Sequence, residues 1–189
     1  MNQNPNVHYF NYRDATPPHL HPTGRSGKVL TMSEGQNIYV ERLFISPGHN
    51  FFGHHDQAAG AHATIEITEA ECVAGKGLVG DRFFDFKDDY KGQITFVAAE
   101  VFDDVCRNLG VTGKLAGVTR RNVVTRGVDL NTLIGRQFTV QGVRFEGMSQ
   151  CSPCHWMNQA IATGAEAALQ GRGGLRARIL TDGKLRAGA

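Results

Sequence analysis

The feature that most constrains the fold of this chain is a series of short strand-like segments separated by closely spaced glycines. Alternating or apolar runs occur at residues 37–45, 62–73, 93–96, 122–125, 137–140, 143–147 and 175–180. The 189 residues include 23 glycines, and Gln141-Gly142 between two of the runs is typical of a tight hairpin turn. Because the runs do not alternate regularly with long helices, a doubly wound sheet is not expected. We predict a mainly β (α+β) fold, a β-barrel with two or three peripheral helices.

Helical periodicity is clear in two places. Apolar residues recur at intervals of four over residues 97–109, and Gly110 supplies a stop signal. Residues 156–169 also keep helical spacing. Thr163 and Glu166 fit a capping box inside that segment, which predicts two short helices in place of one long one.

Composition indicates one globular domain preceded by a tail. Residues 1–36 are rich in Asn, Pro, His, Gly and Ser and are expected to form a flexible N-terminal arm, with Met32 as an alternative start to Met1; the folded domain is predicted over 37–189. No secretory signal and no apolar run of roughly 20 residues is present, so a cytoplasmic protein that does not enter membranes is expected. The net charge of +2 comes from scattered basic residues, which argues against a nucleic-acid surface but allows a small anion pocket.

The four cysteines divide into two kinds. Cys72 lies in a strand-like run and Cys106 on the apolar face of a predicted helix, so both are expected in the core. Cys151 and Cys154 form a CxxC pair after a predicted hairpin, where neither a thioredoxin-like βαβ context nor a fourfold zinc ligand set is apparent. A reactive Cys154 at a loop-to-helix junction, where a helix N-terminus favours a thiolate, and a purely structural pair both stay open.

Several arginines stand where they could bind an anion. Arg82 follows Gly80-Asp81 at a strand end, and it suits either a phosphate contact or a local salt bridge. Strand alternation places Arg120 and Asn122 on one face, as a ligand contact or as part of a polar rim. Arg176 lies in a Gly-rich basic cluster with Arg172 and Arg178, which suits either an anion site or a solvated loop.

A second constellation consists of histidines. Four of the eight, His49, His54, His55 and His62, fall within fourteen residues, together with Asp56. Imidazoles beside a carboxylate suit zinc or iron. The spacing matches no helical metal motif, so an exposed loop is the alternative to a separate metal site at His54 and His55.

Taken together, these segments resemble the MOSC domain, the family named after the C-terminal part of molybdenum cofactor sulfurases. The similar stretches are GLVGDRF (77–83), GQITFVAAE (92–100), TRRNVVTRGVDLNTLIGRQF (119–138), GVRFEGMSQCSPC (142–154) and GRGGLRARILTDG (171–183). The resemblance implies a β-barrel fold that recognises the molybdenum cofactor, a pterin with a dithiolene and a phosphate. Members of the family include reductases of N-hydroxylated compounds and sulfur carriers or sulfurase domains.

Residue by residue, the resemblance implies that Cys154 is the molybdenum ligand or the persulfide site. It also implies that Arg82, Arg120 and Asn122 hold the pterin and its phosphate, with Gln93 near the same site. The chain departs from the reductases at Arg121, where they resemble one another in having proline, and in the loop SPGHNFFGHH (46–55).

The chain shows no aminotransferase-like domain with a lysine for pyridoxal phosphate, and no flavin or iron–sulfur domain. A small-molecule substrate with an external electron donor, or an external cysteine desulfurase as sulfur source, is therefore implied. Three hypotheses follow: a molybdenum-dependent reductase, a sulfur carrier that forms a persulfide on Cys154, and a non-catalytic barrel that binds a metal or a partner.

Overall fold

The computed structural model describes residues 38–50 and 58–189. Its strands are β1 (Tyr39–Ile45), β2 (Ile65–Ile67), β3 (Glu69–Val73), β4 (Gly77–Leu78), β5 (Ile94–Ala98), β6 (Val123–Arg126), β7 (Gln137–Val140), β8 (Val143–Gln150), β9 (Leu175–Ile179) and β10 (Gly183–Arg186). Its helices are α1 (Ala99–Asn108), α2 (Trp156–Ala160) and α3 (Ala165–Ala168), with 3-10 turns η1 (Ala116–Thr119) and η2 (Leu130–Leu133). The mainly β prediction is confirmed.

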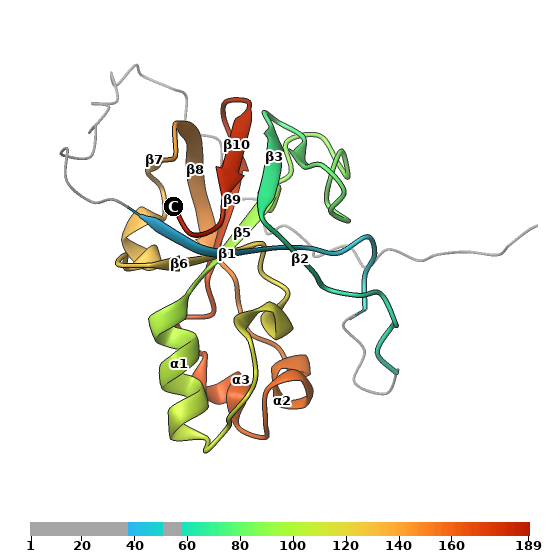
Figure 1. Ribbon diagram of the computed structural model, residues 1–189, viewed down its shortest axis with the longest axis vertical. Helices are drawn as coiled ribbons and strands as arrows, with labels where there is room; N and C mark the ends of the chain where they lie inside the picture. Colours follow the sequence, from blue (N-terminus) through green and yellow to red (C-terminus); the bar gives the residue numbers. More distant parts are fainter. Residues whose placement is uncertain (1–37, 51–57) are drawn as a thin grey trace, which may run out of the picture. The chain divides into compact units, whose positions relative to one another are not determined.

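The strands form two sheets (Figure 1). The first has seven strands in the order β2-β1-β6-β5-β9-β8-β7, and the second has three in the order β10-β3-β4. Within the first sheet β5 and β6 run parallel, joined through α1 and η1, while the other paired strands are antiparallel. The central strand β5 is buried at every position, as expected for a strand covered on both faces.

The predicted closed barrel is not confirmed in the described part of the chain. The expected strand over 62–73 bends at Thr68, so that β2 pairs with β1 while β3 pairs with β10 and β4. This bend divides the strands between two sheets and leaves β2 and β7 at the ends of the larger one. The sheets nevertheless share one core, in which Cys72, Leu78 and Leu185 pack with residues of the larger sheet.

The three α-helices lie together on one side of the larger sheet, away from β3 and β10 (Figure 1). Phe102 and Val105 of α1 and Trp156 of α2 join a second core with Phe44 and Val124 from the sheet. No helix of the described residues is long and apolar enough to cross a bilayer. The predicted N-terminal arm, with the two alternative starts, lies outside the described residues.

Helix α1 begins two residues later than its periodicity suggests. Val97 belongs to β5, where it pairs with Val124 of β6, and Gly110 ends the helix with a φ of 65°. The prediction of two helices after the CxxC pair is confirmed, but the capping box is wrong because Gly164 occupies the N-cap of α3. The Oδ1 atom of Asn158 instead accepts the backbone N–H groups that open that helix.

Candidate functional site

A cleft of about 180 Å³ contains four of the eight predicted site residues. Its lining comes from five separate parts of the chain: His49 and Asn50; Arg82, Phe83, Tyr90, Gly92 and Thr95; Thr119, Arg120 and Arg121; Cys151, Ser152, Cys154 and Met157; and Arg176. The fold therefore brings Cys154 together with Arg82, Arg120 and Arg176. It leaves Asn122 and Gln93 behind the lining, buried in the protein.

Below the cleft, a buried carboxylate organises the first arginine. Asp81 accepts hydrogen bonds from the backbone N–H groups of Ser46 and Phe83, both at 3.1 Å, and from Nδ2 of Asn122 at 3.1 Å. Its Oδ2 atom also pairs with Nη1 of Arg82 at 3.3 Å. The strand-end salt bridge that the sequence left open for Arg82 is thus formed, and it uses one edge of the guanidinium.

Arg82 is held on several sides while it lines the cleft. Its Nη2 donates to the backbone oxygen of Arg120 at 3.3 Å, and its guanidinium carbon lies 4.7 Å from the centre of the Phe83 ring. Burial lowers the pKa of Arg82, while the charge of Asp81 opposes that shift. A cation fixed in this way is preorganised to meet an anionic ligand.

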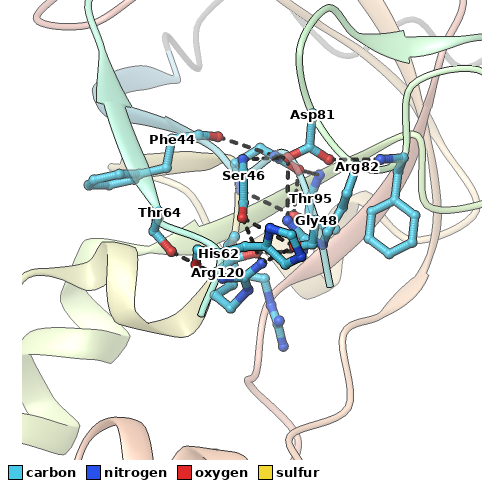
Figure 2. A network of polar contacts seen from close by, with 12 residues as sticks. Phe44, Ser46, Gly48, His62, Thr64, Asp81, Arg82, Thr95 and Arg120 are labelled. Atoms are coloured by element: carbon cyan, nitrogen blue, oxygen red, sulfur yellow. Dashed lines mark hydrogen bonds and ion pairs between the residues drawn. The ribbon is translucent and has the colours of Figure 1, made fainter. Parts of the chain in front are cut away.

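Arg120 ties two loop segments to the sheet (Figure 2). Its Nη2 donates to Ser46 Oγ at 2.7 Å and to the Gly48 oxygen at 2.6 Å, and its Nη1 donates to the His62 oxygen at 3.3 Å and to Thr64 Oγ1 at 3.4 Å. Burial, and then the positive charge of Arg82, lower the pKa of Arg120 to about 10. The group still carries its charge at neutral pH, and four of its donor bonds end on protein oxygens.

Arg121 and Arg176 contribute charge that no described carboxylate neutralises. Nε of Arg121 donates to the Gly173 oxygen at 3.2 Å and its Nη1 to the Thr119 oxygen at 3.1 Å, both neutral acceptors. Neither Arg121 nor Arg176 forms an ion pair within residues 38–50 and 58–189. Nor does any described Asp or Glu line the cleft. The cleft is therefore a focus of positive potential.

The predicted C-terminal basic cluster separates in space. Arg178 pairs with Asp89 at 2.8 Å and with Glu146 at 3.7 Å, and Arg172 pairs with Asp104 at 2.8 Å. Only Arg176 of the three lines the cleft.

The two cysteines of the CxxC pair differ in exposure. Cys151 is buried and Cys154 is exposed, and both line the cleft. Cys154 stands just before α2, whose N-cap is His155, so the expected loop-to-helix junction is present. The backbone at Gly173 packs closely against this loop, because a Cβ atom at residue 173 would lie 2.3 Å from the Cys151 backbone oxygen. Only a glycine allows the two segments to approach so closely.

The two buried amides have structural partners. Oδ1 of Asn122 accepts from the backbone N–H and the hydroxyl of Thr95, and its Nδ2 donates to Phe44 and Asp81. Gln93 donates to the Gly75 oxygen and accepts from the Ile179 N–H, both at 2.8 Å. In this structure both side chains support the site from inside the fold.

An aromatic wall at the cleft was not anticipated from the sequence. The His49 ring lies 4.8 Å from that of Phe83, which in turn packs against Phe86 at 5.6 Å and Tyr90 at 5.2 Å. The sequence signal for this wall was the run of aromatic residues that follows Gly80-Asp81, namely Phe83, Phe86 and Tyr90. Burial first, and then the charges of Arg82 and Arg120, lower the pKa of His49.

Two of the four clustered histidines were predicted to form a separate metal site. His54 and His55 lie outside the described residues. Within the described ranges no group of three or more His, Cys, Asp or Glu side chains is arranged to hold a metal ion. The separate metal site stays a prediction.

A larger cavity of about 330 Å³ lies elsewhere, between the start of α1, η2 and Gly174. Its charged lining residues are Glu100, Asp129 and Arg172, and it contains neither a cysteine nor a histidine. Because the nucleophile and the unneutralised cations lie in the smaller cleft, we take that cleft as the candidate site.

By its fold and its cleft, the chain is a small α+β domain that presents a cysteine in an arginine-lined cleft. The chain belongs to the MOSC domain family, whose match spans residues 77–189 and includes all cleft residues except His49 and Asn50. Strands β1, β2 and β3 precede the matched segment but belong to the same two sheets.

Solved structures support the fold. The YuaD protein from Bacillus subtilis is similar at a TM-score of 0.61 and 18% identity, covering 79% of this chain and 91% of that one. YiiM from Geobacillus stearothermophilus has a TM-score of 0.58 at 14% identity, covering 80% and 72%. YiiM from Escherichia coli has a TM-score of 0.50 at 18% identity, covering 78% and 67%. Comparison with curated proteins gives no match.

Proposed function

We propose that this MOSC protein binds the molybdenum cofactor in the arginine-lined cleft, with Cys154 as the metal ligand. The observation that supports the proposal most strongly is the juxtaposition of one exposed thiol with four arginines in a cleft whose described lining has no carboxylate. A thiolate is a soft donor of the kind that suits such a metal, and arginines are the preferred partners of phosphate.

The residues divide into contacting and positioning groups. Arg121 and Arg176 have the least engaged guanidinium groups and would hold the phosphate, with Arg82 beside them. Arg120 would contribute charge while fixing the loops, and Asn122 and Gln93 would act through Asp81 and the sheet. When bound, the cofactor would supply two-electron redox chemistry for reducing an N-hydroxylated small molecule, with electrons from a separate donor.

Metal and pterin analysis of the protein made in a cofactor-competent host tests this proposal. Near-stoichiometric molybdenum and pterin are expected in the unaltered chain and in Cys106→Ser, whose cysteine lies outside the cleft. Cys154→Ser should retain less molybdenum, and Arg121→Ala should lose pterin and molybdenum together. A chain free of both metal and pterin under these conditions would overturn the proposal.

A sulfur carrier is the second candidate, favoured by the exposure of Cys154 next to a buried Cys151. Cys154 would accept sulfur from an external cysteine desulfurase as a persulfide and pass it on. Intact mass after incubation with a desulfurase and cysteine should increase by one sulfur atom. If Cys154→Ala gained the same mass, the persulfide would have to reside on another cysteine.

A further inference from the structure

We propose that the cleft also catalyses sulfur transfer from thiosulfate and related sulfane-sulfur dianions to a thiol or cyanide acceptor, with Cys154 as the nucleophile. This activity uses only residues of the chain and requires no molybdenum. It differs from the carrier role above because the donor is a small inorganic anion, which binds in the cleft itself, and no partner protein is needed.

Electrostatics favour this reaction in the cleft. A thiolate attacking a dianion brings like charges together, and these charges repel each other near a protein surface. Cations placed around the meeting point offset this repulsion. Arg82, Arg121 and Arg176 line the same cleft as Cys154, and Arg121 and Arg176 have no described carboxylate partner.

The cleft also supplies hydrogen-bond donors that the described residues leave open. Arg121 uses Nε and Nη1 on backbone oxygens, and its Nη2 has no hydrogen bond within the described residues. The side chain of Arg176 likewise makes no hydrogen bond to another described residue, and Tyr90 lies within the electrostatic reach of Arg176 and Arg82. Guanidinium groups with open donors match the oxygens of a sulfonate-type group.

The size of the cleft, about 180 Å³, is sufficient for a compact tetrahedral dianion beside Phe83 and Tyr90. Among the four cysteines only Cys154 is exposed, so it alone presents its sulfur to a ligand in the cleft.

The chemistry balances without an added oxidant. The Cys154 thiolate attacks the outer sulfur of thiosulfate, a new S–S bond forms, and the old S–S bond breaks with its electron pair leaving on sulfite. One thiolate and one dianion become one persulfide anion and one sulfite dianion. Cyanide then takes the terminal sulfur as thiocyanate, or a thiolate takes it as a new persulfide, and the Cys154 thiolate is restored.

The experiment uses the full chain purified from a host that makes no molybdenum cofactor. Thiocyanate formation from thiosulfate and cyanide is measured at mildly alkaline pH, where cysteine thiols ionise. Turnover should be lost in Cys154→Ser. The KM for thiosulfate should rise about 10-fold to 100-fold in Arg121→Ala and in Arg176→Ala, because each removes a charged donor. Arg121→Lys, which keeps the charge, should recover part of that loss.

Arg178→Ala is the matched control. Arg178 lies on β9 two residues after Arg176 but pairs with Asp89 and Glu146 outside the cleft, so its loss should leave KM unchanged. An uncharged trisulfide donor should be nearly insensitive to the Arg121 and Arg176 substitutions. The Arg178→Ala control and the uncharged donor together distinguish a loss of anion recognition from a general loss of structure. Circular dichroism of each variant checks that the fold is intact.

Thiocyanate formation no faster than in folded Cys154→Ser would overturn the proposal. So would equal KM values for unaltered protein, Arg121→Ala and Arg176→Ala. Neither result bears on molybdenum, because cofactor content is measured separately on protein from the competent host.

Discussion

Asn122 and Arg82 share one carboxylate oxygen: Oδ2 of Asp81 accepts from Nδ2 of Asn122 at 3.1 Å and from Nη1 of Arg82 at 3.3 Å. The same Asn122 amide also bonds Thr95 and Phe44. The buried Asn122 side chain, which lies just before β6, therefore connects β1 and β5 to Asp81 and through it to Arg82 in the cleft. Its effect on a ligand would be indirect, through the position of Arg82.

Replacing Asn122 should destabilise the fold. Asn122→Ala leaves the Thr95 donors and part of the Asp81 carboxylate without partners, and an unsatisfied buried polar group costs about 1–3 kcal/mol. Asn131→Ala, which removes an exposed amide, should change stability by only about 0.5 kcal/mol. Urea unfolding of both variants measures the difference, and equal losses would contradict the buried role of Asn122.

The Gly173 position should be intolerant of any side chain. In Gly173→Ala the new Cβ would lie 2.3 Å from the Cys151 oxygen, so the loop that carries Cys154 must shift. Overpacking of this kind costs about 1–3 kcal/mol. In Gly171→Ala the added Cβ atom has no neighbour within 4 Å. The substitution therefore adds only backbone strain at a φ of +76°, which costs about 1–2 kcal/mol. The reactivity of the Cys154 thiol, followed with a chromogenic disulfide, should change in the first variant and not in the second.

Acidification should selectively weaken the protein through His49. The folded state lowers the pKa of His49 below its ordinary value of 6.5, through burial and through Arg82 and Arg120. Between the folded pKa and 6.5 the unfolded chain binds more protons, so this contribution is complete above pH 6.5 and declines as the pH falls through that window. The free energy of unfolding should therefore fall more steeply on acidification in the unaltered protein than in His49→Gln. Parallel pH profiles would refute this assignment.

The four thiols should react in a fixed order. Cys154 is exposed and should be modified first, and Cys106, whose pKa is raised by burial and by Asp103, should follow slowly. Burial raises the pKa of Cys72 to about 12, so Cys72 should react only on unfolding, as should the buried Cys151. Counting modified thiols against time tests the order, and Cys154→Ser should lack the fast phase.

Four residues of the predicted site, Arg82, Arg120, Cys154 and Arg176, line one cleft, but the geometric reason for grouping Arg120 with Asn122 was wrong. Alternation was expected to place Arg120 and Asn122 on one face, yet Arg120 adopts a φ of 57°, where alternation no longer holds. Its guanidinium therefore lines the cleft while the Asn122 amide turns into the core. A left-handed arginine has no distinct sequence signal, so this outcome could not be predicted.

The arrangement of the sheets was also only partly predictable from the sequence. The hairpin at Gln141-Gly142 was predictable because Gly142 accepts positive φ between two alternating runs, and the structure gives Gln141 and Gly142 φ values of 49° and 83°. Strand β10 was missed because only Leu185 of its four residues is buried, which leaves no apolar pattern to detect. The bend at Thr68 depends on pairing with β10, more than 100 residues away along the chain, and local propensity does not encode it.

The origin of the cleft lining in five separate segments, from His49 to Arg176, has a consequence for the order of folding. Contacts so distant in sequence are slow to form, so the anion site should be among the last features to mature and should be absent from partly folded chains. Binding of an anion to the completed site would then slow unfolding and raise the melting temperature as the anion concentration increases above its Kd, while leaving the rate of folding unchanged.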